Sequence, residues 1–249
     1  MSNTAAEERV RSVRERVARA CRSAGRLPDD VQLIGVSKRQ PAERIAAAVR
    51  AGVTQLGENY VQELQQKRAQ VASLVGAERA ETVRWRMIGG LQRNKARAVV
   101  PLVDSVDSLD RESLAAELDK RAATAGKTLE ACIQVNLSHE PQKGGVSEED
   151  LPALLAVCAG LTRLQVVGLM TVPAATPDPE ASRPVFAHLR KLRDTLRESP
   201  GGGELRELSM GMSGDFEVAI EEGATLIRVG TALFGPRDEP QQALLTENP

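Results

Sequence analysis

The sequence predicts an α/β protein, a single (β/α)8 TIM barrel with one extra helix at its N-terminus. Short apolar runs typical of strands alternate strictly with helix-like segments, which favours parallel strands joined by helical crossovers. Eight such units fit into 249 residues, the usual size of this barrel. The first strand-like run is followed by SKRQP (37–41) instead of the glycine-rich turn of a doubly wound nucleotide-binding sheet, which disfavours that alternative.

The first helix is expected over residues 4–24. Val10, Val13 and Val17 recur at helical spacing, and arginines surround this apolar stripe. A basic helix could contact RNA or a membrane surface. A stripe packed on the protein, with a solvated arginine face, is the favoured interpretation.

The barrel units follow in order, each strand-like run preceding a helix. Pro41 near the start and Gly52 near the end frame the first of these helices. The expected strands are 31–37, 54–59, 83–89, 103–108, 129–136, 164–170, 205–212 and 225–230. The expected helices are 41–52, 60–75, 93–100, 110–126, 148–160, 179–196, 215–223 and 231–235. We therefore expect one domain over 1–237, including the first helix, and a C-terminal tail over 238–249.

The composition excludes several classes of function. The chain has 33 Lys and Arg against 34 Asp and Glu, and only 2% aromatic residues, so neither a general nucleic-acid surface nor a base-stacking platform is expected. The three cysteines form no CxxC pair and no Cys/His cluster, which argues against a disulfide framework and a metal site. The charged N-terminus is unlike a signal peptide, and no apolar run approaches the roughly 18 residues of a membrane helix. We expect a cytoplasmic protein with reduced thiols.

Lys38 stands out because it ends the first apolar run, and barrels collect their functional residues at the C-terminal ends of strands. An inward lysine beside an apolar wall loses its charge easily, because desolvation disfavours the ammonium form. Such an amine can form a Schiff base with an aldehyde. A rim lysine that reaches into solvent is the alternative interpretation.

The loops after the seventh and eighth strands carry small and hydroxyl residues, where many barrels bind phosphate. Ser213, Gly230 and Thr231 are the candidate phosphate ligands, with ordinary turn chemistry as the alternative. A lysine on the first strand and a phosphate site on the last two predict an aldehyde that carries a phosphate. Pyridoxal 5′-phosphate (PLP) fits this description.

The chain resembles the pyridoxal-phosphate homeostasis protein family (YggS- and PROSC-like PLP-binding proteins) over about residues 5–237. The matching motifs are VSKRQP (36–41), GENYVQE (57–63), WRMIGGLQRNK (85–95), SVDS (105–108), VNLSHEPQKGG (135–145), GLM (168–170), LSMGMSGDFEVAI (208–220) and RVGTALFGPR (228–237). The resemblance implies a barrel like the N-terminal domain of alanine racemase, PLP fold type III, without the second β domain of that enzyme.

The resemblance also implies roles for individual residues. Lys38 would hold PLP covalently, and Arg228 would face the pyridine nitrogen. The further implied cofactor-binding residues are Asn59, Met210, Ser213, Gly230 and Thr231, with Ser209 nearby. In one position the chain departs from the family. The third strand usually reads W-H-F-I-G, whereas here Arg86 and Met87 follow Trp85, so no role of that histidine is carried over.

These features favour a PLP carrier in vitamin B6 homeostasis that stores, buffers or delivers the cofactor through a reversible Schiff base. Racemisation needs a second base, which the resemblance assigns to a tyrosine of a partner's β domain; this chain has only Tyr60. Arg228 against the ring nitrogen would also weaken PLP as an electron sink. We therefore expect no catalytic residues and no metal. Apo PLP enzymes could be recipients, and Lys143 could capture PLP transiently, although an exposed loop lysine is the favoured interpretation there.

Two alternatives stay open at this point. One is a PLP-dependent amino-acid racemase or related enzyme, and the other is a PLP-independent scaffold that binds RNA through the first helix. The balanced charge and the missing β domain favour a monomer with no membrane or nucleic-acid partner.

Overall fold

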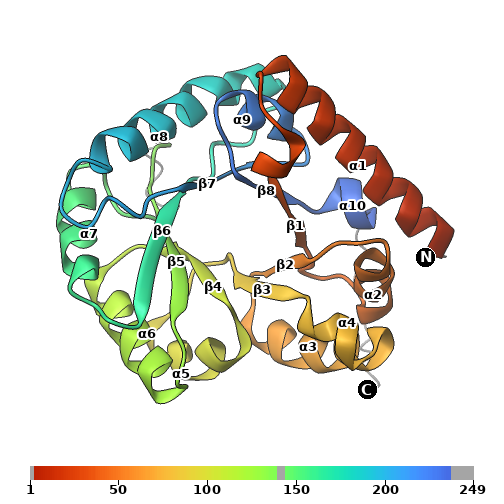
Figure 1. Cartoon of the computed structure of the whole chain (residues 1–249), viewed down its shortest axis with the longest axis horizontal. Helices are drawn as coiled ribbons and strands as arrows, with labels where there is room; N and C mark the ends of the chain where they lie inside the picture. Colours follow the sequence, from red (N-terminus) through yellow and green to blue (C-terminus); the bar gives the residue numbers. More distant parts are fainter. Residues whose placement is uncertain (1–2, 139–143, 237–249) are drawn as a thin grey trace, which may run out of the picture.

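The computed structural model describes residues 3–138 and 144–236 and consists of a closed parallel barrel with helices outside it (Figure 1). The strands follow one another around the barrel in chain order, and β8 closes it against β1, with Ile34 opposite Arg228. The strands are β1 (Gln32–Val36), β2 (Gln55–Glu58), β3 (Arg84–Met87), β4 (Ser105–Leu109), β5 (Leu129–Gln134), β6 (Leu164–Met170), β7 (Glu207–Met212) and β8 (Leu226–Val229). The predicted fold class is confirmed.

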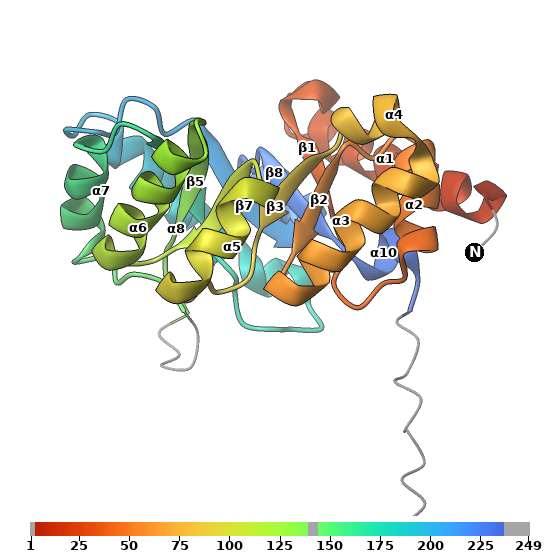
Figure 2. The same cartoon turned by 90° about the horizontal axis from the view of Figure 1, so that it is seen from below.

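The helices cover the outer face of the barrel, and the side view shows α3, α5 and α6 outside the strands (Figure 2). They are α1 (Asn3–Ser23), α2 (Ala42–Arg50), α3 (Val61–Val75), α4 (Ala77–Glu81), α5 (Ala96–Val99), α6 (Glu112–Thr124), α7 (Leu151–Ala159), α8 (Arg183–Leu196), α9 (Phe216–Glu221) and α10 (Thr231–Phe234). Short 3-10 turns occur at η1 (Pro28–Asp30), η2 (Arg93–Lys95), η3 (Val100–Leu102) and η4 (Pro179–Ser182). The sequence pattern did not reveal α4, and the helix expected at 93–100 is divided among η2, α5 and η3.

Helix α1 packs across the seam where the barrel closes, against α2, α9 and α10. Its stripe of Val10, Val13 and Val17 is buried, as predicted. Arg16 also pairs with Glu217 of α9 at 2.6 Å between Nε and Oε1, with its guanidinium over the Phe216 ring. The packed face of α1 therefore joins the first unit of the fold to the last.

The barrel interior contains a buried ion pair that explains the departure at the third strand. Nε and Nη2 of Arg86 each lie 2.9 Å from a carboxylate oxygen of Asp107. Ser105 donates to Asp107 at 2.6 Å, and Arg86 also donates to Gln55 at 3.1 Å. Burial opposes the charge on Arg86, but the Asp107 carboxylate outweighs it and raises the pKa of the guanidinium. Arg86 is thus a core residue whose charge is balanced and whose guanidinium is hydrogen-bonded on every nitrogen.

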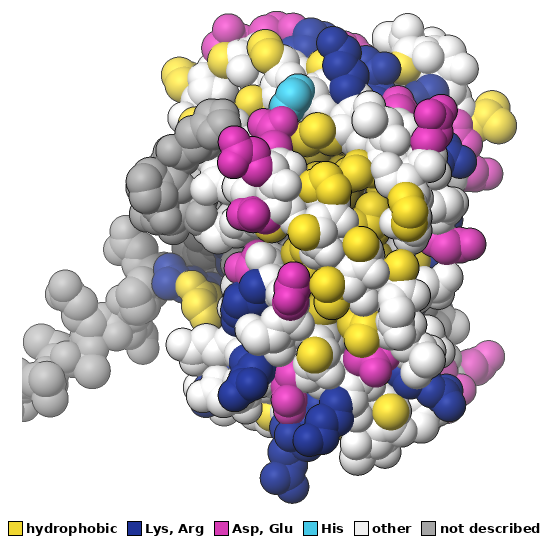
Figure 3. All heavy atoms as spheres, turned by 90° about the vertical axis from the view of Figure 1, so that its left-hand side faces the viewer, with side chains coloured by type: hydrophobic (Ala, Val, Ile, Leu, Met, Phe, Trp, Pro, Cys, Tyr) yellow, Lys and Arg dark blue, Asp and Glu magenta, His cyan; other side chains and the backbone are white. Residues whose placement is uncertain are grey.

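The α7 side of the molecule carries apolar side chains at its surface (Figure 3). Val157 on α7 is 40% exposed, and a hollow beside it is lined by Leu155, Leu161 and Leu164 among others. Large exposed apolar patches are often sites of contact with another protein chain, which could be a second copy. The expectation of a monomer therefore stays a prediction. Within the described ranges, no helix is both long and apolar enough to cross a membrane, and no side-chain group is arranged to hold a metal ion. The expected tail, 238–249, falls outside those ranges.

Candidate functional site: a cavity at the barrel mouth

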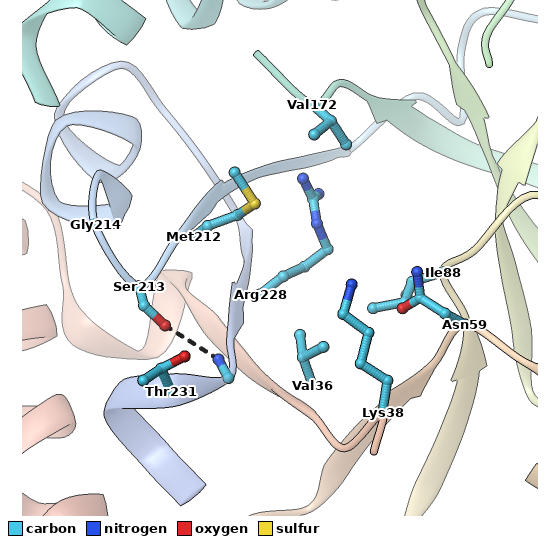
Figure 4. A pocket seen from close by; sticks show the side chains of 11 residues that line it. Val36, Lys38, Asn59, Ile88, Val172, Met212, Ser213, Gly214, Arg228 and Thr231 are labelled. Atoms are coloured by element: carbon cyan, nitrogen blue, oxygen red, sulfur yellow. Dashed lines mark hydrogen bonds between the residues drawn. The ribbon is translucent and has the colours of Figure 1, made fainter. Parts of the chain in front are cut away.

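A cavity of about 350 Å³ lies at the C-terminal ends of β1, β2, β3, β6, β7 and β8 (Figure 4). Its wall combines apolar side chains with a few polar groups, the usual composition of a small-molecule site. The lining residues are Val36, Lys38, Asn59, Ile88, Val172, Met212, Ser213, Gly214, Arg228, Gly230 and Thr231.

Lys38 enters the cavity from the turn after β1. Val36 lies on the same face two residues earlier, because successive strand residues alternate sides. The lysine side chain is half-buried and its amine points into the space between Asn59 and Arg228 (Figure 4). An amine held in this position can reach a ligand in the cavity.

The opposite wall is built by the turns after β7 and β8. The Ser213 hydroxyl accepts a hydrogen bond from the backbone N–H of Gly230 at 3.2 Å (Figure 4). It accepts a second, from the N–H of Ala232, at 3.5 Å. The hydroxyls of Ser213 and Thr231 therefore converge at one end of the cavity, where the two N–H groups are already bonded to the Ser213 oxygen. Such convergence of donors favours an anion.

Arg228 forms part of the cavity floor. Its guanidinium donates to the Ser209 hydroxyl and to the Thr171 carbonyl, both at 2.8 Å, and forms no ion pair with any residue in the described ranges. Burial lowers the pKa of this guanidinium, and the charges of Asp107 and Asp215 only partly offset that effect. A buried cation without a carboxylate partner favours a ligand that offers an acceptor or a negative charge.

The structure brings together nearly all the residues expected at the site. Lys38, Asn59, Ser213, Arg228, Gly230 and Thr231 line the one cavity, and Ser209 lies directly beneath as a partner of Arg228.

Met210 is the exception. Its side chain is fully buried in the core outside the barrel, whereas Met212 lines the cavity. The pairing of β7 with β8 shifts between Ser209 and Met212, and Gly211 has a φ of 90°. The resulting bulge turns Met212 into the cavity while Met210 stays in the core, although strict alternation would put both side chains on the same side of β7.

Apolar contributions from Val36, Ile88, Val172 and Met212 were missed from the sequence. Val36 could have been found by counting back two residues from Lys38. Lys143, considered as a second lysine for PLP, lies outside the described residues.

Comparison with known proteins places this cavity in a family. The family model for the N-terminal domain of alanine racemase matches residues 10–238. A pyridoxal phosphate homeostasis protein of Aquifex aeolicus is 43% identical over 230 residues, covering 92% of this chain and 97% of that protein. The protein of the same name from Escherichia coli is 38% identical, with coverages of 91% and 94%. This chain belongs to the pyridoxal phosphate homeostasis protein family.

Solved structures agree with this assignment. PipY of Synechococcus elongatus, with PLP bound, superposes with a TM-score of 0.80 at 38% identity, covering 92% of this chain and all of that one (100%). Alanine racemase of Corynebacterium glutamicum has a TM-score of 0.64 at 16% identity over 92% of this chain and 61% of that one, which shows a shared fold.

Proposed function

We propose that this protein binds PLP through a reversible Schiff base with Lys38 and serves to store, buffer or deliver the cofactor. The observation that carries the proposal is that the Lys38 amine and the anion-binding end share one cavity. A relative with PLP bound and relatives named for PLP homeostasis support the same conclusion. We place the protein in the cytoplasm, where its buried free cysteines would stay reduced.

The groups present suit each part of the cofactor. The Ser213 and Thr231 hydroxyls would hold the phosphate, joined by the Gly230 N–H, which would exchange its bond to the Ser213 oxygen for one to the ligand. Arg228 would face the ring nitrogen. Within the described ranges, Oδ1 of Asn59 is a buried acceptor without a hydrogen-bond partner. Buried polar atoms are rarely left unpaired, so a ligand donor is the natural partner for this oxygen.

The PLP aldehyde supplies the electrophile, and the residues of the chain control its capture. The uncharged Lys38 amine forms the C=N bond with loss of one water, and hydrolysis restores both partners. A carrier needs this step to be reversible. Apo PLP enzymes are the proposed recipients of the released cofactor.

Two features favour a carrier over a racemase. Arg228 is a permanent cation where the ring nitrogen would lie, and it disfavours protonation of that nitrogen. Tyr60, the single tyrosine, is 44% exposed at the rim next to Arg39 and does not line the cavity. The second base that racemisation requires is thus not supplied by this tyrosine.

Borohydride reduction tests the proposal. We expect PLP to give a phosphopyridoxyl adduct on Lys38 by peptide mass mapping, and Lys38→Ala to remove both the adduct and the Schiff-base absorbance. Ser213→Ala combined with Thr231→Ala is expected to weaken PLP binding more than binding of pyridoxal, which lacks the phosphate. An adduct mainly on another lysine, or steady racemisation of L-alanine over many turnovers, would overturn the carrier proposal.

A further inference from the structure

A cluster of one buried lysine, one buried glutamate and one partly buried glutamate lies behind the turn that carries Lys38. We refer to Lys67, Glu58 and Glu63 as the Lys67 cluster. We propose that this cluster positions the Lys38 amine by locking the turn over residues 37–40, and so sets how fast Lys38 captures an aldehyde. The inference rests on the proposed function and assigns a role to residues that do not line the cavity.

Lys67, on the inner face of α3, uses all three of its donors. Its ammonium donates to the Ser37 carbonyl at 2.7 Å, to Oε1 of Glu58 at 2.9 Å and to Oε2 of Glu63 at 2.6 Å. Only 10% of the side chain is exposed. Only the ammonium form of lysine has three N–H donors, and it has no lone pair with which to attack an aldehyde. Lys67 therefore links α3 to the turn and is not an alternative nucleophile.

The two glutamates hold the residues on either side of Lys38. The Ser37 hydroxyl donates to Oε1 of Glu58 at 2.7 Å, and the Arg39 backbone N–H donates to Oε2 of Glu63 at 2.7 Å. Within the turn, the N–H of Gln40 donates to the Ser37 carbonyl at 3.0 Å. Lys38 is therefore bracketed by residues that are fixed to the Lys67 cluster.

The turn needs such support because Arg39 has a φ of 57°. It is the one residue other than glycine with positive φ in the described parts of the chain. A side chain at positive φ is unfavourable and persists when the surroundings over-determine the conformation. The bond from the Arg39 N–H to Glu63 supplies that constraint immediately after Lys38.

The charges in the cluster depend on one another. Burial raises the pKa of Glu58, and the Ser37 hydrogen bond and the Lys67 charge offset this only in part. Partial burial would also raise the pKa of Glu63, but hydrogen bonds from Lys67 and the Arg39 N–H lower it. Removing Lys67 would leave the Glu58 and Glu63 carboxylates close together without the cation between them. The turn would also lose the hydrogen bond from Lys67 to the Ser37 carbonyl.

The test separates capture of the aldehyde from binding of the rest of the cofactor. Pyridoxine 5′-phosphate carries an alcohol in place of the aldehyde, so it occupies the cavity without reacting with Lys38. We expect Lys67→Met to slow Schiff-base formation with PLP, followed by absorbance, by about 10- to 100-fold, since small displacements of reacting groups have effects of this size. The affinity for pyridoxine 5′-phosphate is expected to stay within about twofold, because the Lys67 cluster does not contact the cavity.

Lys127→Met is the matched control. Lys127 is half-buried, more exposed than Lys67, and likewise donates to a backbone carbonyl, that of Val103 just before β4, at the end of the barrel away from the cavity. Its loss should lower the melting temperature while leaving the capture rate unchanged. The inference would be overturned if Lys67→Met captured PLP as fast as Lys127→Met does. It would also be overturned if Lys67→Met lost affinity for pyridoxine 5′-phosphate by the same factor as it lost capture rate.

A second pair of variants avoids dependence on the folding of Lys67→Met. Glu63→Ala removes the acceptor for the Arg39 N–H and is expected to slow capture. Adding Arg39→Gly should restore much of the rate, because glycine adopts positive φ without support. No rescue would contradict the inference, whereas absence of any Lys38 adduct in the unaltered protein would instead refute the proposed function.

Discussion

The ion pair inside the barrel gives the sharpest prediction of stability. The Arg86 side chain is 2% exposed and that of Asp107 is fully buried, and two 2.9 Å bonds join them. Removing one partner of such a pair leaves an uncompensated buried charge, at a typical cost of about 3–5 kcal/mol. We therefore expect Asp107→Leu and Arg86→Met each to lower the free energy of unfolding by about 4 kcal/mol.

The double variant tests whether the cost comes from an unpaired buried charge. With both charges gone, mainly the Gln55 and Ser105 side chains lose partners, at about 1 kcal/mol each. Arg86→Met combined with Asp107→Leu is thus expected to be more stable than either single variant.

Urea unfolding of the PLP-free protein gives the free energy of unfolding of the unaltered chain, the two single variants and the double variant, which together form a double-mutant cycle. At roughly 2–4 °C per kcal/mol for a chain of this size, the single variants should melt about 8–16 °C lower. Single costs below about 1 kcal/mol, or costs that simply add in the double variant, would refute the conclusion that Arg86 and Asp107 stabilise the barrel as a coupled pair.

Three further predictions follow from local geometry. Gly89→Ala would place a Cβ 2.6 Å from the Asn59 carbonyl oxygen, so we expect a loss of about 1–3 kcal/mol, and an unchanged melting temperature would contradict this. Burial raises the pKa of the Cys158 thiol to about 11, so this thiol should react with Ellman's reagent at about pH 8 only after unfolding. Because its partners hold the pKa of Glu63 below 4.5, its contribution to stability is complete above that value and is lost as the pH falls through the lowered pKa. Glu63→Gln should therefore flatten the fall of the urea midpoint below about pH 5, and an identical acid profile would speak against it.

The architecture was predictable because its signals are local. The alternation of apolar runs and helices needs only neighbouring residues, and Lys38 stood out because a charged side chain followed a buried run. Met210 was expected from the family resemblance, and nothing in the sequence separates it from Met212, two residues later on the same side of an ideal strand. The bulge that sends only Met212 into the cavity arises from the pairing of β7 with β8, which one sequence does not display.

The roles of Lys67 and Arg86 could not be predicted for a different reason. Lys67 lies in the polar segment QQKRAQ, which looks like a solvated helix face, and it is buried only because α3 packs behind the β1 turn. Arg86 needs Asp107, on the next strand, before its charge is acceptable in a core. Both depend on contacts between elements, which a single sequence does not display.

The position of α1 has a consequence for how the chain matures. The partner of Arg16 in α9 lies 201 residues later, so at about 5–20 residues per second the ribosome needs roughly 10–40 s to supply it. During that interval α1 has its contacts with η1 and α2 but not those with α9 and α10, and the turns that face Lys38 have not yet been synthesised. A nascent chain therefore cannot take up PLP until the segment from β7 to α10 has been synthesised, when α9 and α10 bury the valine stripe of α1 and the turns after β7 and β8 complete the pocket.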